Sequence, residues 1–321
     1  MPDPRPSNDL FPPSGEALCW MALTFAPDVG AVAARRLADC FGSAAAVLRT
    51  PVPQLVGAGR VTPAVARQIA AIAANFDQVS AAAETMGGEG IRLLLLDDPD
   101  YPANLAPLRD APPALYLRGD PQPSDERAVA VVGTRQPSEA GAQAARLVAR
   151  TLAQEDITIV SGLALGIDAA AHAGALETGR TLAALGSGLS NVYPARHRPL
   201  ADAVARQGAL FSERPPDASP ARRHLLARNR LIAGLARAVL VVQVRSRGGS
   251  FTTARHALRL GRPVFVMGWP EPEFAAGAQR LAQMGAHSVT HASDLAAIAM
   301  AASLPLPEVE QPTLDDLYDD S

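Results

Sequence analysis

The chain has 321 residues and a formal net charge of −3, and 48% of its residues are hydrophobic, so two domains with a sizeable core are expected. Every long apolar run is interrupted by arginine or glycine well before ~20 residues, which excludes a membrane-spanning helix. All 29 basic residues are arginines, and the missing lysine excludes a P-loop and Schiff-base catalysis, because both need a lysine side chain.

The first part of the chain is predicted to be helical after a disordered start. Residues 1–15 are Pro-rich and acidic and lack the apolar core of a signal peptide, which favours a cytoplasmic protein. Residues 16–88 carry apolar side chains at helical spacing, and Thr62 is expected to cap one of the helices. Cys19 and Cys40 are expected to be core residues, and neither they nor the six scattered histidines suggest a metal site.

The following part, residues 89–300, is predicted to be an α/β domain. Strands are expected at 91–96, 128–132, 157–160, 181–185, 209–211, 238–242 and 263–267, and helices at about 138–154, 167–178, 198–207, 252–260 and 275–284. Apolar strands that alternate with amphipathic helices predict a parallel sheet with helices on both faces. Residues 301–321 are Pro-rich and then acidic, and are expected to be a disordered tail.

Four of the predicted strands end in small loops, which are Gly133-Thr134-Arg135, Ser161-Gly162 followed by Gly166, Gly186-Ser187-Gly188, and Gly248-Gly249-Ser250 preceded by Arg247. Glycine lets backbone amides approach an anion, and a helix N-terminus adds a positive partial charge. One such loop is typical of any tight strand-to-helix turn. Four at the carboxyl edge of one sheet favour a surface that binds several phosphates.

A basic run favours a nucleic-acid backbone as the source of these phosphates. Residues 222–262 contain ten arginines and no acid, and the guanidinium fork suits phosphate. A dinucleotide cofactor is disfavoured, because the first loop, "GTRQPS", departs from Gly-x-Gly-x-x-Gly and the second strand ends at Ser161 rather than at an acid. No cofactor is therefore expected.

Several blocks, in order along the chain, resemble the DNA-processing protein A family, also called DprA or Smf. They include "VVGTRQPSEAG", "VSGLALGIDAAAH", "ARNRLIAGLARAVLVV" and "RGGSFTTARHALRLGRPVFVM". The resemblance implies an extended Rossmann-like domain after a helical domain similar to a sterile-alpha-motif (SAM) fold, and no C-terminal winged-helix domain. It also implies a cytoplasmic, homodimeric protein without catalytic residues. Such a protein binds single-stranded DNA, protects it during natural transformation and loads a RecA-type recombinase.

The resemblance also implies which residues contact DNA, because individual positions match the family's motifs. Asp168 matches a family position too, and is expected to orient a loop rather than touch DNA, since an acid repels phosphate. The expected contacts are Gly133, Thr134, Arg135, Ser161, Gly162, Gly166, Gly186, Gly188, Arg228, Asn229, Arg230, Arg247, Gly248, Gly249, Ser250 and Arg255.

The sequence departs from the family at two places. His224-Leu225-Leu226 stand where the family often has Asn-Phe-Pro, whose Phe can stack on a base, and Gln243 replaces a common acid. Stacking contributes ~1–3 kcal/mol per base, so another group is needed to supply it. Trp269 and His224 are the candidates.

Two alternatives stay open. The first is an enzyme similar to nucleoside-monophosphate phosphoribohydrolases. These enzymes use a Pro-Gly-Gly-x-Gly-Thr-x-x-Glu motif, and the segment "RGGSFTTAR" resembles it superficially. Arg255 stands at the position of the catalytic Glu and Phe251 at that of a Gly, so the acid/base group is missing. The second alternative is a scaffold that has lost its DNA role.

Overall fold

The helical part expected at the start of the chain is present and consists of six helices. The computed structural model describes residues 15–306, so residues 1–14 of the expected disordered start and the residues from 307 onward lie outside the described residues, whereas Gly15 begins the first helix. The helices are α1 (Gly15–Phe25), α2 (Ala31–Phe41), α3 (Ala44–Arg49), α4 (Val52–Gly57), α5 (Pro63–Ala74) and α6 (Phe76–Gly88). Thr62 caps α5 as expected, because its hydroxyl oxygen accepts from the Val65 amide.

The rest of the described chain is built on one sheet. Its strands are β1 (Ile91–Leu95), β2 (Ala114–Gly119), β3 (Ala128–Val132), β4 (Thr158–Ser161), β5 (Thr181–Leu185), β6 (Ala209–Ser212), β7 (Ala238–Val241), β8 (Val264–Met267) and β9 (His287–Val289), in the order β1-β2-β6-β5-β4-β3-β7-β8-β9. Strands β3 to β9 pair in parallel, whereas β1 and β2 add an antiparallel edge. The expected sheet is confirmed, with the correction that it is mixed.

Helices cover both faces of the sheet, as predicted. They are α7 (Glu139–Gln154), α8 (Ile167–Ala175), α9 (Arg198–Gln207), α10 (Arg222–Ala227), α11 (Asn229–Leu235), α12 (Gly249–Arg259), α13 (Pro272–Gln283) and α14 (Asp294–Ser303), with 3₁₀ turns η1 (Pro123–Glu126) and η2 (Ala195–His197). Helix α12 begins at Gly249 rather than at 252, and α14 ends at Ser303, three residues past the expected boundary at 300. Helices α10, α11 and α14 were not predicted.

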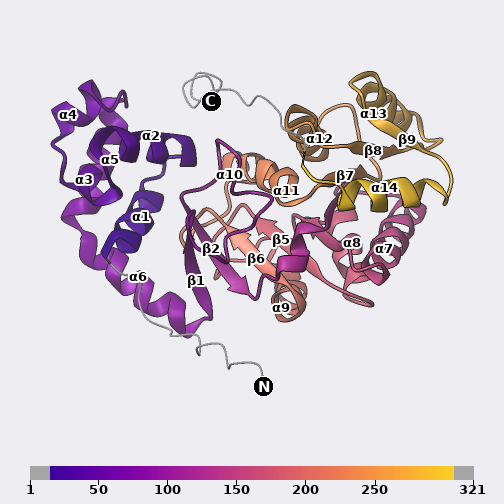
Figure 1. Ribbon diagram of the computed structural model, residues 1–321, viewed down its shortest axis with the longest axis horizontal. Coiled ribbons are helices and arrows are strands. Elements are labelled where there is room, and N and C mark those ends of the chain that lie inside the picture. Colours follow the sequence, from indigo (N-terminus) through magenta and orange to yellow (C-terminus); the bar gives the residue numbers. More distant parts are fainter. Residues whose placement is uncertain (1–14, 307–321) are drawn as a thin grey trace.

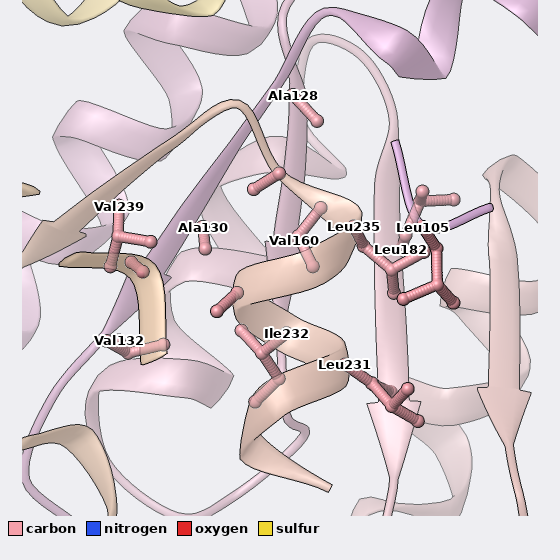
Figure 2. Packing of buried hydrophobic residues seen from close by; sticks show 14 of the residues in the cluster. Leu105, Ala128, Ala130, Val132, Val160, Leu182, Leu231, Ile232, Leu235 and Val239 are labelled. Atoms are coloured by element: carbon pink, nitrogen blue, oxygen red, sulfur yellow. The ribbon is translucent and has the colours of Figure 1, made fainter. Parts of the chain in front are cut away.

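The central strand β3 shows why the sequences of the parallel strands are continuous apolar runs. Val129 and Val131 pack with α7, α8 and α14 on one face, whereas Ala130 and Val132 pack with α11, α12 and α13 on the other. Figure 2 shows Ile232 and other side chains of α11 lying over this second face. Because both faces are buried, both alternating sets of side chains must be apolar.

The strand order places a crevice at the carboxyl ends of β3 and β7. The chain starts the parallel part at β3, adds β4, β5 and β6 on one side, and then returns to β7 on the other. The helices that follow these two strands, α7 and α12, cover opposite faces, so the loops that lead to them diverge. Such a topological switch point is where ligands bind in open α/β sheets.

The helical part packs against the antiparallel edge of the sheet. Figure 1 shows α1 and α6 next to β1 and β2, at the end of the sheet remote from α13 and β9. Met21 and Ala22 of α1 share a buried cluster with Tyr116 of β2, and the Thr24 hydroxyl lies 2.7 Å from the Tyr116 hydroxyl. The two parts of the described chain therefore share a core.

Candidate nucleic-acid interface

A groove of about 810 Å³ lies at the switch point. Its lining includes nine of the expected contacts, namely Gly133, Thr134, Arg135, Arg228, Asn229, Arg247, Gly248, Gly249 and Ser250. Gly162 and Gly186 line a small hollow beside it, together with Arg135 and Arg228. The remaining expected contacts line neither space, and they are Ser161, Gly166, Gly188, Arg230 and Arg255. The structure thus brings eleven of the sixteen expected residues together around two adjoining spaces, and whether they contact DNA stays a prediction.

Gln243 joins the two loops that form the crevice. Its side chain is fully buried, accepts from the Ser138 amide at 3.0 Å and donates to the Ser138 hydroxyl at 2.8 Å. Its carbonyl oxygen accepts from the Thr134 amide at 2.8 Å. A neutral amide can donate and accept at the same site, which a carboxylate cannot. Gln243 therefore fixes the loop after β3 relative to the end of β7.

The helices that follow β3, β4 and β7 begin near the groove, and their N-termini differ in which groups satisfy the backbone amides. Ser138 caps α7, and its hydroxyl accepts from the Gly141 amide. At α8, the Ile167 amide donates to the Thr134 carbonyl oxygen. Helix α12 has no side-chain cap, and Gly249 and Ser250 in its first turn line the groove. An uncapped N-terminus presents unsatisfied amides and a positive partial charge, and these are features that suit an anion.

Exposed arginines surround this helix N-terminus. Arg135 and Arg247 line the groove, and so does Arg222 of α10. Within residues 15–306, none of these three has an ion-pair partner. Their charge is therefore available to a bound polyanion.

Arg228 lies beneath the groove and is only 4% exposed. Its guanidinium donates to the carbonyl oxygens of Gly162, just after β4, and Ala184, near the end of the neighbouring β5. Burial lowers the pKa of Arg228 to about 10, and the nearby Asp168 carboxylate opposes that shift. The guanidinium is occupied inside the protein, which favours a bracing role over direct contact with phosphate.

Asp168 orients the loop after β4, as expected. Its carboxylate accepts from the Gly162 amide at 3.2 Å and the Ala164 amide at 3.4 Å. Burial raises its pKa, although Arg228 and these two amides favour the charged form. Arg228 thus holds this loop at a carbonyl oxygen, and Asp168 holds it at two amides.

The other two residues of the Arg-Asn-Arg block also face inward. Asn229 donates to the Gly249 carbonyl oxygen at 3.2 Å and so positions the start of α12. Arg230 pairs with Glu213 and lies 3.6 Å from Asp110. The block therefore joins four segments, which follow β1, β4, β6 and β7, to the end of β5 and to α11.

Several expected contacts have packing roles that the sequence did not reveal. The Ser161 hydroxyl donates to the Val131 carbonyl oxygen at 2.7 Å inside the sheet. A Cβ on Gly188 would lie 2.1 Å from the Pro216 carbonyl oxygen, and one on Gly186 would lie 2.8 Å from the Leu225 Cα. Gly166 has a φ of +78°, which L side chains rarely adopt. These residues allow close approach between loops, and whether they also contact DNA stays a prediction.

The ten arginines of 222–262 do not form one uncompensated patch, which corrects the expectation from the sequence. Acids from distant segments pair with four of them, which are Arg223 with Asp28, Arg230 with Asp110 and Glu213, Arg237 with Glu126, and Arg245 with Glu273. Arg262 is buried and donates to four carbonyl oxygens, and Arg228 is occupied as described. The basic surface of the groove is therefore smaller than the run suggested.

The family assignment follows from comparison with known proteins. The DNA recombination-mediator protein A family matches residues 92–299. The chain belongs to this family. Protein Smf from Synechocystis sp. is 39% identical over 221 residues, which cover 67% of this chain and 55% of that protein. The chain thus spans about half the length of this relative of the DprA/Smf family.

Two solved structures of the family resemble the fold. DNA processing protein A (DprA) from Streptococcus pneumoniae is 33% identical with a TM-score of 0.65, covering 77% of this chain and 86% of that one. DNA processing protein A from Helicobacter pylori, a structure that addresses single-stranded DNA binding, is 27% identical with a TM-score of 0.57. It covers 72% of this chain and 96% of that one. These similarities confirm the Rossmann-like fold that the motifs implied.

The two candidates for base stacking are placed away from the groove lining. The Trp269 indole donates to the Val242 carbonyl oxygen and packs against a buried cluster. His224 lines a second cleft of about 650 Å³ between the helical part and the sheet, and its Nε2 accepts from Arg223. The groove is lined instead by Tyr193, which the sequence analysis missed although it follows the Gly186-Ser187-Gly188 loop closely.

The structure gives no support to the hydrolase alternative in this DprA/Smf-family chain. Phe251 is buried, with the Arg280 guanidinium 5.0 Å from its ring centre, and Arg255 is exposed.

Within the described residues, no group of three histidine, cysteine or acidic side chains is placed to hold a metal ion. No helix of residues 15–306 combines the length and apolar character needed to cross a membrane.

Proposed function

We propose that this chain binds single-stranded DNA along the groove between β3 and β7. The main observation behind this proposal is that the N-terminus of α12 lies in the groove without a side-chain cap. Arg135 and Arg247 line the same groove, and both are exposed and without ion-pair partners among the described residues. The strand's phosphates meet the amides of Gly249 and Ser250 and the two guanidinium groups. Family membership and the DNA-binding relative from Helicobacter pylori support this proposal.

The expected contacts divide into two groups in this proposal. Arg135, Arg247 and the start of α12 touch phosphate, whereas the Arg-Asn-Arg block holds the loops in place. The proposed role is binding without catalysis and without a cofactor. The position of the hydrolase Glu is held by Arg255, which cannot act as a general acid or base at neutral pH.

The test is fluorescence anisotropy with a ~30-nucleotide poly-dT strand and a duplex control over a range of salt concentrations. A bound single strand gives a log–log salt slope of about −0.7 per phosphate contact. The variant Arg135→Ala/Arg247→Ala should flatten the slope by about 1.4, two contacts' worth.

Arg206→Ala is the control for removing an exposed arginine away from the groove, and it should leave the salt slope unchanged. Arg206 is exposed at the end of α9, and the C-terminus of a helix that follows a parallel strand lies at the edge of the sheet opposite to the groove. Equal slopes for the double variant and the wild-type chain would overturn the proposed site. Equal affinity for duplex and single strand would overturn the single-strand preference.

We also propose that the chain passes the bound strand to a RecA-type recombinase in natural transformation, acts as a homodimer and works in the cytoplasm. The family description as a recombination mediator supports the recombinase partner. Adding the chain to a strand coated with single-strand-binding protein should shorten the lag before recombinase filaments form. An unchanged lag would contradict this role, and a solution mass equal to one chain would contradict the homodimer.

A further inference from the structure

Tyr193 is an exposed aromatic side chain in the groove. It is 43% exposed, and it lies in the loop that joins β5 to α9. Among the described residues that line the groove, it is the one aromatic. It also lines the adjoining hollow, with Arg135, Leu165 and Leu225. Because so much of this side chain is exposed, it contributes less to the buried core than a fully buried ring does, and its face is accessible to a ligand.

The loop that carries Tyr193 is held in place at several points. The Gly188 amide donates to the Ala218 carbonyl oxygen at 2.9 Å, and the Ser190 amide donates to that of Pro216 at 2.8 Å. After the tyrosine, His197 Nδ1 donates to the Leu163 carbonyl oxygen at 2.8 Å. The ring is thus presented from a fixed backbone, which lowers the entropy cost of binding.

The surroundings of Tyr193 combine apolar surface with positive charge. Leu226 of α10 also lines the groove and is 41% exposed. Arg135 lines both the groove and the hollow with Tyr193. Figure 1 shows α10 beside α11, above the strands of the central sheet. A strand whose phosphates lie on arginines and amides has unpaired bases available for an apolar surface, whereas the bases of a duplex are already paired and stacked.

We propose that the Tyr193 ring is the platform on which an unpaired nucleobase stacks, next to the phosphate contacts of the groove. This inference rests on the proposed function and names the part of the ligand that the phosphate contacts do not recognise. It assigns the stacking role to a loop after β5, and not to the α10 positions 224–226, which carry no Phe in this chain. Every base has a stacking face, so the platform selects single strands without selecting a sequence.

The test is a double-mutant cycle between the protein and the strand. Wild-type chain, Tyr193→Phe, Tyr193→Leu and Tyr193→Ala are each titrated into a ~10-nucleotide dT strand. Each is also titrated into a strand of the same length in which abasic residues replace the thymidines. Tyr193→Phe should bind dT within about twofold of the wild-type chain, and Tyr193→Ala should bind it about 5- to 150-fold more weakly. Tyr193→Leu should fall between them, because it keeps the apolar surface and loses the ring.

The abasic strand separates stacking from every other role of Tyr193. All four proteins should bind it with equal affinity, and the salt slope on dT should be the same for all four, because no charge changes. Equal losses on dT and abasic strands would overturn the proposal, and so would unchanged dT binding by Tyr193→Ala. Failure of the wild-type chain to bind dT would instead overturn the proposed function itself. Equal thermal midpoints for the four proteins show that the fold is intact, as expected for an exposed side chain.

Discussion

Replacing Arg228 by methionine should lower the free energy of unfolding. It should weaken DNA binding only indirectly, through the loops that Arg228 holds. The substitution leaves the carbonyl oxygens of Gly162 and Ala184 without their guanidinium donor, and leaves the buried Asp168 without its cationic neighbour. A buried acceptor left without its donor costs about 1–3 kcal/mol, and this substitution leaves two. We expect a loss of this size in the free energy of unfolding.

Urea unfolding followed by circular dichroism measures this loss, with Arg222→Met as the control. Arg222 belongs to the same basic run and lines the same groove, but it is exposed, so its replacement should change stability by less than about 0.5 kcal/mol. If the two variants unfold at the same urea concentration, the bracing role of Arg228 is wrong. A loss of DNA affinity with unchanged stability would then favour direct contact between Arg228 and phosphate.

The cost of Arg228→Met should also depend on pH. Burial already raises the folded-state pKa of Asp168, and loss of the arginine raises it further. A carboxyl group whose folded-state pKa exceeds its unfolded value loses stability as pH rises from the unfolded value to the folded one. The stability difference between variant and wild-type chain should therefore be larger at pH 8 than at pH 5. Adding Asp168→Asn should recover part of the loss at pH 8.

Three other changes test separate features. Gly188→Ala should destabilise the chain by about 1–3 kcal/mol in urea unfolding, because its Cβ meets rigid backbone, whereas Gly268→Ala, which meets nothing within 4 Å, should not. Ser250→Asp should weaken binding of a dT strand about tenfold or more in anisotropy titrations without loss of stability, because its carboxylate occupies the positive end of α12. Burial lowers the pKa of His172 to about 3, so its imidazole stays neutral in the folded protein, and stability should fall as pH drops below about 6.5. This histidine contributes about 2 kcal/mol of that loss between pH 7 and pH 5, and His172→Gln should make the pH dependence shallower.

The sequence was sufficient to locate the parallel strands because burial on both faces leaves a continuous apolar run. The residue bounds of β3 and β5 agree with the prediction for this reason. Strand β2 was missed because it follows Pro112-Pro113 and pairs antiparallel, so no helix follows it to complete a recognisable unit. Strand β9 has three residues, two of them exposed, and carries no periodic pattern. Local pattern therefore predicts the buried centre of the sheet better than its edges.

Charge was harder to predict than hydrophobicity, because ion pairs join residues far apart in the sequence. Arg223 reaches Asp28 across 195 residues, and Arg237 reaches Glu126 across 111. A run without acids can therefore be compensated wherever the fold brings acids to it. The four glycine loops do follow the carboxyl ends of β3, β4, β5 and β7, but the division of the arginines into exposed and buried ones depends on three-dimensional packing.

This division explains how a slightly acidic chain can carry the proposed phosphate-binding groove. Buried arginines such as Arg228 and Arg262 donate to carbonyl oxygens at strand and helix ends. They therefore hold loops in place and add little to the electrostatic potential at the surface. Exposed ones such as Arg135 and Arg247 provide the local field that attracts a polyanion. The two kinds should separate experimentally, since exposed arginines set the salt dependence of binding and buried ones set the stability of the loops that present them. A substitution that changed both by similar amounts would show that loop shape and phosphate contact are carried by the same side chain.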